Sequence, residues 1–347
     1  MEMKKSLLAV LMVFLLMIAN ACSSGTTSGK SSSSSSSDGD TKKEKIEINV
    51  AYGNQPGEPI DQQANKWKEL AAEASDGQIV LNLYPSSQLG AEKDVVEQAK
   101  MGNNVIVMAG YDFLMDYVPD AGILTAPYLT ENLDDLVYLT TTDWFAGLTD
   151  KLREQDIEIV NGNTAYGVRH LMTNEKVTTP EELAGLKIRV PNNQMSIKTF
   201  EALGATATPT PLGDLYTSLQ QGLIDGAENP LPVLQGVKAQ EISKHLSLTG
   251  HQKFITSWIA GTGFIESLPA DVVEILKETG NEAAEYGRTV LEEQTDNVLE
   301  EFKNEGVEVH EIDIAPFKAK VGSVYEAFPD WTPGLYEEIQ KLLENKQ

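Results

Sequence analysis

The chain has 347 residues and a formal net charge of −25 at pH 7. So large an excess of acidic residues argues against a nucleic-acid-binding protein and against a protein held on anionic lipid by its own charge. It also repels anionic ligands, so a site for an anion must be built locally from arginines.

The N-terminus has the pattern of an export signal. Two lysines within Met1–Lys5 precede the apolar run Leu7–Ala19, which is shorter than the about 20 residues that span a bilayer. Cys22 follows Ala-Asn-Ala and resembles the lipid-attachment cysteine of bacterial lipoproteins, although alanine stands where leucine is usual three places before it. We therefore expect a signal peptide over residues 1–21 and a lipid on Cys22. The alternative is ordinary cleavage near residue 21 with an incidental thiol. No second cysteine exists, which excludes an intrachain disulfide.

Residues 22–44 are mostly Ser, Gly, Thr, Asp and Lys, with seven consecutive serines from Ser31. Such a segment cannot bury apolar surface, and we expect it to be a flexible tether that is lipidated at its start. The roughly 300 residues that follow exceed one comfortable core and predict two lobes. We place lobe I at residues 45–166 and 255–295, and lobe II at residues 167–254 and 296–347.

Strands and helices alternate through the first lobe. The predicted elements are a strand at Lys45–Tyr52, a helix at Asp61–Ala74, a strand at Ile79–Tyr84, a helix at Gly90–Met101, a buried strand at Val105–Met108 and a mostly helical segment at Asn132–Leu152. Two further strands are predicted at Ile157–Val160 and Tyr166–Thr173. The second carries Arg169, and we expect it to cross from lobe I into lobe II.

The stretch from Gly185 to Pro232 is the most informative part of the chain. It predicts a strand at residues 186–190, a helix at Gln194–Leu203, a short strand at Ala205–Thr208, a helix at residues 215–221 and a strand at Leu223–Ala227. Strands and helices alternating at this spacing predict a parallel sheet, and ligands bind at the carboxyl ends of such strands.

The last third of the chain contains the return crossing and a long helix. Phe254–Ile265 is extended and apolar, and we expect it to cross back to lobe I. Pro269–Asn304 is acidic and helical, with Gly280 and Gly287 as places where a kink or break could occur. A last strand is predicted at residues 307–312, and helices close the chain.

Arg189 and Asn229 stand out in the Gly185–Pro232 stretch because each lies at the carboxyl end of a predicted strand. A guanidinium offers a planar fork that suits a carboxylate, and an amide beside it can complete the recognition. The alternative is structural: Arg189 would be an ion-pair partner, and Asn229, just past the end of its strand, a turn residue.

The same stretch resembles the substrate-binding proteins of tripartite ATP-independent periplasmic (TRAP) transporters, of the dicarboxylate-binding type. The resemblance rests on KIRVP, ALGA, TPTP and LYTSLQQGLIDGAENP, and outside the stretch on LYPSSQLG, YVPDAGILTAPYL and LSLTGH, all in collinear order. It covers nearly everything from about residue 46 onward. It implies that Arg189 binds the ligand carboxylate, that Arg169 is a second pocket arginine and that Asn229 lies in the pocket.

The resemblance also implies a fold and a function. The fold would be a two-lobed periplasmic-binding-protein-like α/β fold, each lobe a mostly parallel sheet flanked by helices, with crossing strands and a long interlobe helix. The protein would be a lipid-anchored extracytoplasmic receptor that captures a small organic acid and delivers it to TRAP membrane subunits. The ligand would be a C4-dicarboxylate or a sugar acid. Asn192 and Asn193 directly follow the Arg189 strand and are candidates for binding its hydroxyls; the alternative is that they are turn residues. Tyr166 is a candidate for lining the cleft; the alternative is that it packs in the core.

The residues offer no catalytic constellation. The four histidines, His170, His245, His251 and His310, lack zinc-ligand spacing, and no nucleophile elbow exists. We therefore expect no enzyme activity, no cofactor and no metal site. Two alternatives remain at this point: a binding protein that serves another importer or a sensor, and a secreted hydrolase with a carboxylate pair that sequence alone does not reveal.

Overall fold

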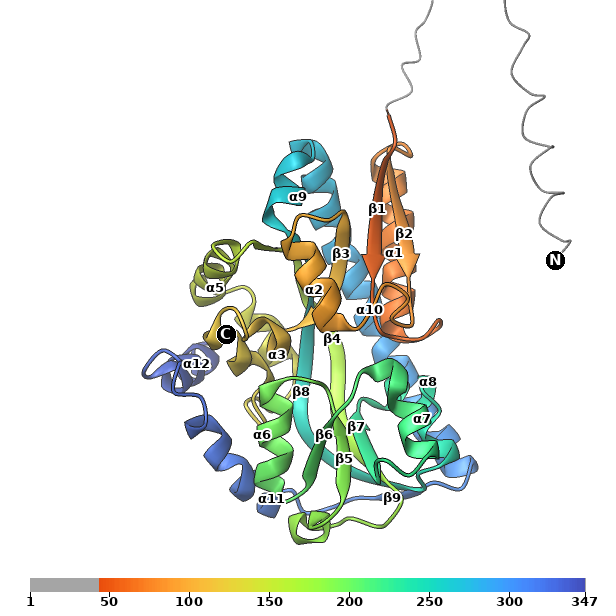
Figure 1. Cartoon of the computed structure of the whole chain (residues 1–347). Helices are drawn as coiled ribbons and strands as arrows, with labels where there is room; N and C mark the ends of the chain where they lie inside the picture. Colours follow the sequence, from red (N-terminus) through yellow and green to blue (C-terminus); the bar gives the residue numbers. More distant parts are fainter. Residues whose placement is uncertain (1–43, 347) are drawn as a thin grey trace, which may run out of the picture. The chain divides into compact units, whose positions relative to one another are not determined.

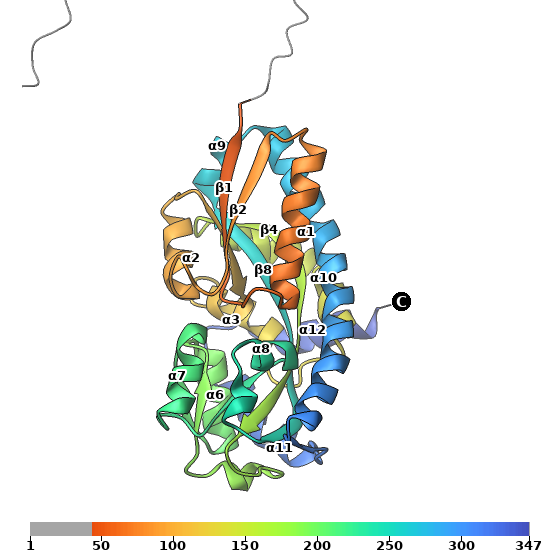
Figure 2. The same ribbon diagram turned by 90° about the vertical axis from the view of Figure 1, so that its right-hand side faces the viewer.

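The computed structural model describes residues 44–346. The expected signal peptide, the lipidation site Cys22 and nearly all of the tether lie outside these residues. Within them, strands and helices form an upper and a lower part that are joined by long elements running through both (Figures 1 and 2).

All of the strands in this region belong to one sheet. They are β1 (Ile46–Ala51), β2 (Ile79–Tyr84), β3 (Val105–Gly110), β4 (Ile157–Thr173), β5 (Lys187–Val190), β6 (Thr206–Pro209), β7 (Gly226–Asn229), β8 (His245–Gly261) and β9 (Glu308–His310). The strand order is β2-β1-β3-β8-β4-β7-β5-β6, and β9 pairs with β8.

The helices cover the faces of this sheet. They are α1 (Pro59–Ala74), α2 (Glu92–Lys100), α3 (Tyr111–Leu114), α4 (Leu133–Leu139), α5 (Asp143–Arg153), α6 (Gln194–Leu203), α7 (Leu215–Gln220), α8 (Leu231–Gly236), α9 (Thr262–Ser267), α10 (Ala270–Asn304), α11 (Ala315–Val321) and α12 (Leu335–Glu344).

Each part contains a set of parallel strands, as the sequence predicts. In the upper part β1 pairs in parallel with β2 and β3, and in the lower part β5 pairs in parallel with β6 and β7. The two sets are not separate sheets, because β4 and β8 run antiparallel to each other through both parts and join them. The expected crossing strands therefore form the structural link between the two halves.

β4 merges two segments that the sequence predicts as separate strands. The residues between them are polar and interrupt the alternation, but their side chains are satisfied by the helices that pack on the strand. Thr164 accepts a hydrogen bond from Gln63 of α1 at 2.8 Å, and Asn161 donates to Asn281 of α10 at 2.7 Å. The strand therefore continues, with irregular register against β8.

The long helix α10 is continuous over its 35 residues, without the break that its glycines allow. Gly280 and Gly287 instead let α1 pack closely against it (Figure 2). A Cβ at Gly287 would lie 2.9 Å from Cβ of Gln63, and one at Gly280 would lie 3.3 Å from the Trp67 ring. These glycines are explained by helix packing.

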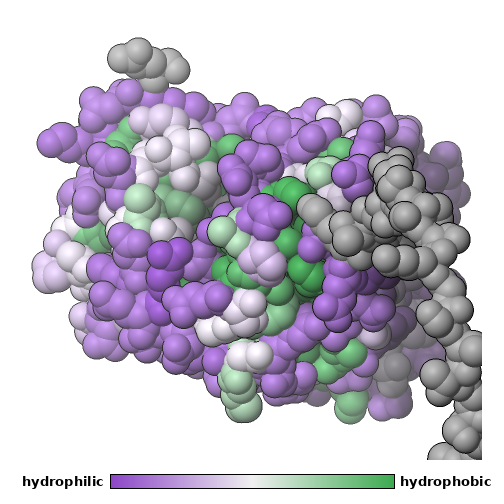
Figure 3. All heavy atoms as spheres, turned by 90° about the horizontal axis from the view of Figure 1, so that it is seen from above, coloured by the Kyte–Doolittle hydropathy of each residue, from purple (hydrophilic) through white to green (hydrophobic). Residues whose placement is uncertain are grey.

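The surface agrees with the acidic composition. Most of the face in Figure 3 is hydrophilic, with apolar residues gathered near its centre. Within residues 44–346, no helix combines the length and apolar character that crossing a bilayer requires.

Candidate functional site

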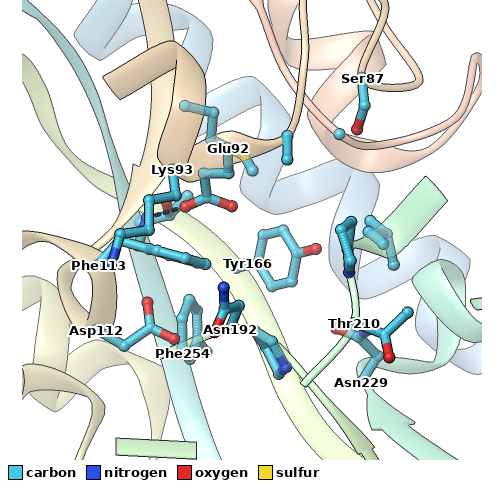
Figure 4. A pocket seen from close by; sticks show the side chains of 18 of the residues that line it. Ser87, Glu92, Lys93, Asp112, Phe113, Tyr166, Asn192, Thr210, Asn229 and Phe254 are labelled. Atoms are coloured by element: carbon cyan, nitrogen blue, oxygen red, sulfur yellow. Dashed lines mark hydrogen bonds between the residues drawn. The ribbon is translucent and has the colours of Figure 1, made fainter. Parts of the chain in front are cut away.

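A cavity of about 210 Å³ lies where the two parts meet. Its walls come from three sources: the upper part, the lower part and the crossing strands. The upper part contributes Glu92, Lys93 and Asp112, and the lower part contributes Arg189, Asn192 and Asn229. The crossing strands contribute Tyr166, Arg169 and Phe254. Figure 4 labels all of these residues except the two arginines.

Arg189 is the cavity's uncompensated cation. It sits on β5, and its side chain is buried with only 3% of the residue exposed. Its Nε donates to the Thr210 carbonyl at 2.8 Å, and among residues 44–346 no carboxylate lies within ion-pair distance of its guanidinium. Burial lowers the pKa of Arg189 to about 10, so the group is still charged at neutral pH. A buried, positioned guanidinium of this kind suits an incoming carboxylate.

Arg169 differs from Arg189 because the protein already neutralises it. Its Nε and Nη2 both donate to the Glu228 carboxylate at 2.6 Å, and His251 Nε2 lies 3.2 Å from the same carboxylate. Burial alone would raise the pKa of Glu228, but the charge and hydrogen bonds of Arg169 lower it to about 2. Glu228 is therefore ionised, and the pair brings no net charge to the cavity that Arg169 lines.

Two carboxyl groups, those of Glu92 and Asp112, line the same cavity as Arg189. Burial raises the pKa of Glu92 to about 8, with the neighbouring Asp112 as a second cause. Burial likewise raises the pKa of Asp112 to about 7, although Arg169 opposes the rise. The Glu92 side chain is only partly buried as a whole, but its carboxyl group is enclosed and accepts from the Gly110 amide at 2.8 Å. A protonated carboxyl group both donates and accepts hydrogen bonds, which suits hydroxyl groups.

The predicted asparagines fall into two groups. Asn192 and Asn229 line the cavity, and the buried Oδ1 of Asn229 has no hydrogen-bond partner in the described chain. Asn229 is the last residue of β7 rather than the first residue beyond it, because that strand begins at Gly226. Asn193 does not line the cavity. Its Oδ1 caps α6 by accepting from the Ser196 amide at 2.8 Å, and its Nδ2 donates to Asp112 at 2.6 Å.

Aromatic rings form the apolar wall. Tyr166 and Phe254, from the two crossing strands, have ring centroids 5.5 Å apart, and Phe254 also lies 5.0 Å below the Arg169 guanidinium. Figure 4 shows the Tyr166 ring in the middle of the view, with Glu92 and Asp112 on one side of it and Asn229 on the other. Such rings can pack against the carbon chain or C–H face of a ligand.

Sequence reasoning missed Glu92, Asp112 and Glu228. Glu92 is an acidic residue in the first turn of a predicted helix. A negative charge stabilises that position of any helix, so the sequence gives no separate sign of a function. Asp112 had one local signal, since it closely follows the carboxyl end of a buried strand. Glu228 shows none, because its pairing with Arg169 depends on β4 and β7 being neighbours.

The net charge of the cavity defines what it can hold. Lys93 lines it too, but its ammonium pairs with Asp116 at 2.7 Å. Among residues 44–346, Arg189 is therefore the buried cation of this cavity without an ion-pair partner, and amide groups and carboxyl groups with raised pKa values line the cavity with it. This arrangement fits a small ligand with a single carboxylate and several hydroxyls.

Comparison with known proteins identifies the family. The model for "Bacterial extracellular solute-binding protein, family 7" matches residues 50–330. A TRAP periplasmic solute-binding protein from Actinobacillus succinogenes 130Z, solved with bound L-galactonate, is 42% identical with a TM-score of 0.85, covering 87% of this chain and 100% of that one. A second, from Ochrobacterium anthropi with bound L-fuconate, is 44% identical with a TM-score of 0.85, covering 86% and 99%.

A third structure differs in conformation. It is a TRAP periplasmic solute-binding protein from Escherichia fergusonii in an apo open form, 26% identical with a TM-score of 0.74, covering 85% of this chain and 99% of that one. These similarities confirm the two-lobed fold expected from the sequence. The chain belongs to family 7 of the bacterial extracellular solute-binding proteins, the substrate-binding proteins of TRAP transporters.

Proposed function

We propose that this protein captures an aldonate-type sugar acid in the cleft and delivers it to the membrane subunits of a TRAP transporter. The observation that carries this proposal is the guanidinium of Arg189, which has no ion-pair partner among residues 44–346, in a cavity that also offers hydrogen-bonding groups and an aromatic wall. Delivery to membrane subunits follows from the role of the family.

The charges distinguish the two ligand classes that the sequence leaves open. A C4-dicarboxylate needs a partner for each carboxylate, and burying the second without a cation is costly. Arg169 is occupied by Glu228, and Lys93 by Asp116. A monocarboxylate with hydroxyl groups satisfies Arg189 and uses Glu92, Asp112 and Asn229 for hydrogen bonds. The aldonates bound to the two similar structures are of this class.

A ligand panel tests the proposal. Calorimetry should rank L-galactonate, L-fuconate and D-erythronate against galacturonate, sialic acid and succinate. We expect a six-carbon aldonate to bind best and succinate at least about tenfold more weakly, a difference of about 1.4 kcal/mol. Succinate as the tightest ligand would overturn the choice of ligand class, and no binding across the panel would overturn the proposal as a whole.

Arg189 should be the main carboxylate anchor. Removing one partner of a buried charge pair costs about 2–5 kcal/mol, or about 30- to several-thousand-fold in affinity. Arg189→Ala should lose binding on this scale. Arg189→Lys should also weaken it substantially, because lysine keeps the charge and loses the planar fork.

Arg153→Lys is the matched control, since Arg153 pairs with Glu158 away from the cavity. Thermal melts of all variants check folding. If folded Arg189→Ala binds within about threefold of the wild type, which is less than about 0.7 kcal/mol, the carboxylate is held elsewhere.

We further propose that the protein is anchored outside the cytoplasmic membrane by lipid on Cys22, with residues 22–44 as its tether. Support comes from the export pattern of the N-terminus and from the family's extracytoplasmic role. Cys22→Ser should move the protein from the membrane to the soluble fraction, as measured by immunoblotting after cell fractionation. Ser23→Ala is the control. An unchanged distribution for Cys22→Ser would contradict lipidation.

A further inference from the structure

Three potential metal ligands meet at the edge of the lower part, outside the cleft. They are His245, at the start of β8, and Glu308 and His310, the first and last residues of β9. One ligand atom from each lies within 4.8 Å of the other two. None of the three lines the cleft cavity.

Strand pairing creates the cluster. β8 and β9 are parallel, with His245 opposite Glu308 and Ser247 opposite His310. Because side chains two residues apart lie on the same face of a strand, all three potential ligands project from one face of this pair. The two histidines are 65 positions apart in the chain, which is why local spacing in the sequence gives no sign of them.

The distances suit a first-row divalent cation. His245 Nδ1 lies 3.2 Å from His310 Nε2 and 3.7 Å from a Glu308 carboxylate oxygen. Ligand bonds of about 2.0–2.2 Å at tetrahedral angles place neighbouring donor atoms about 3.3–3.6 Å apart. The ring planes differ by 21°, and without metal one of the two facing nitrogens can donate its proton to the other. An ion that binds both nitrogens must displace this proton, as metal binding to protonated ligands generally does.

The chemistry selects the metal. Two imidazoles and one carboxylate match zinc and its transition-metal neighbours better than magnesium or calcium, which require oxygen ligands. The site is partly exposed, so an ion can enter from solvent, and Glu308 supplies a negative charge beside both rings. The ammonium of Lys176 acts on His310 and opposes a cation, but the chain as a whole is strongly acidic.

We propose that His245, Glu308 and His310 form a binding site for Zn²⁺ or a similar divalent cation, with a fourth position open to water. The ion would tie β9 to β8, and so fasten the chain that follows α10 to the sheet. This site does not depend on the ligand proposed for the cleft.

Zinc titration of the purified, chelator-treated protein tests the proposal. Equilibrium dialysis with ZnCl₂ should give one ion per chain for the wild type. His310→Ala and Glu308→Gln should each bind zinc at least about tenfold more weakly, because each removes one of three ligands. Glu311→Gln is the matched control, since it removes the same charge from the same exposed segment; its affinity should stay within about twofold of the wild type.

One further measurement and one substitute variant make the outcome decisive. Zinc should raise the melting temperature of the wild type and of Glu311→Gln but not of His310→Ala, because an ion that binds only the folded chain stabilises it. His310→Gln replaces His310→Ala if the latter melts early without metal. Absence of stoichiometric zinc, or equal affinity in the wild type and the folded His310 variant, would overturn the site.

Discussion

Arg189 and Arg169 share one cavity but differ in what surrounds their charges. The paired Arg169 can orient a ligand without adding charge, whereas Arg189 remains a full buried cation. Glu92 and Asp112 line the same cavity, and their raised pKa values place their titration near neutral pH. The charge of the cavity lining therefore depends on pH between about 6 and about 9.

This dependence leads to a prediction for binding. Below about pH 7 both groups are mostly protonated, and above about pH 8 both are ionised. Their negative charges repel an anionic ligand, so its affinity should fall as pH rises from about 6 to about 9, on the order of tenfold. Calorimetry with L-galactonate across this range measures the slope. A sugar acid stays ionised throughout, so the slope reports the protein.

Glu92→Gln should make the profile shallower, because glutamine accepts the Gly110 hydrogen bond without titrating and leaves Asp112 as the titrating carboxyl group of the pair. Glu97→Gln, on the same helix but outside the cavity, should leave the profile unchanged. Affinity that rises with pH in the wild type would show that these carboxyl groups are ionised in the complex.

Sequence reasoning reaches residues whose environment is local. Arg189, Asn192 and Asn229 follow from their places near strand ends, and the structure puts all three on the cavity wall. Asn193 has the same local signal but caps α6 instead of lining the cavity. The sequence does not separate these two roles, because the role depends on the residue at which α6 begins. Glu228 is found only through the pairing of strands far apart in the chain.

At the scale of elements, α1 packs closely on α10, and α1 is also hydrogen-bonded to the crossing strand β4. The contact of the two helices at Gly287 leaves no room for a methyl group beside Gln63, which in turn bonds to Thr164 of β4. The sequence locates both helices from their periodicity. It cannot show why α10 carries glycines. Helix propensity predicts only that glycines destabilise the helix, whereas their role in letting α1 pack closely depends on the neighbouring helix.

Two glycine substitutions should therefore act in opposite directions. Gly147, within α5, has open space around it, so Gly147→Ala should stabilise the protein by about 0.5–1 kcal/mol through helix propensity. Gly287→Ala gains the same propensity but forces a Cβ to 2.9 Å from Gln63 Cβ, and such overpacking costs about 1–3 kcal/mol. Urea unfolding followed by circular dichroism compares them. A stabilised Gly287→Ala would show that α1 shifts freely.

At the scale of the whole molecule, we expect the cleft to open for its ligand to enter. Arg189 is 3% exposed and the cavity is walled from both parts, so a sugar acid that reaches the guanidinium contacts both parts. The two ligand-bound relatives match it with a TM-score of 0.85, and the apo open structure with 0.74. We propose that the two parts are the two lobes, with the boundaries predicted from the sequence. β4, β8 and α10 join them, so a hinge motion must bend these three elements.

We therefore expect ligand to shift the protein from open to closed. A ligand that contacts both lobes binds the closed form more tightly, and a differential affinity of about 10⁴ would convert a mostly open population to a mostly closed one. Small-angle scattering should show a smaller radius of gyration at saturating L-galactonate. Arg189→Ala at the same concentration should show no decrease, which separates closure from effects of the solution. If the wild-type profile is unchanged while calorimetry confirms saturation, the cleft is already closed without ligand, and entry must depend on local motion of the loops around Glu92 and Asn192 rather than on movement of the lobes.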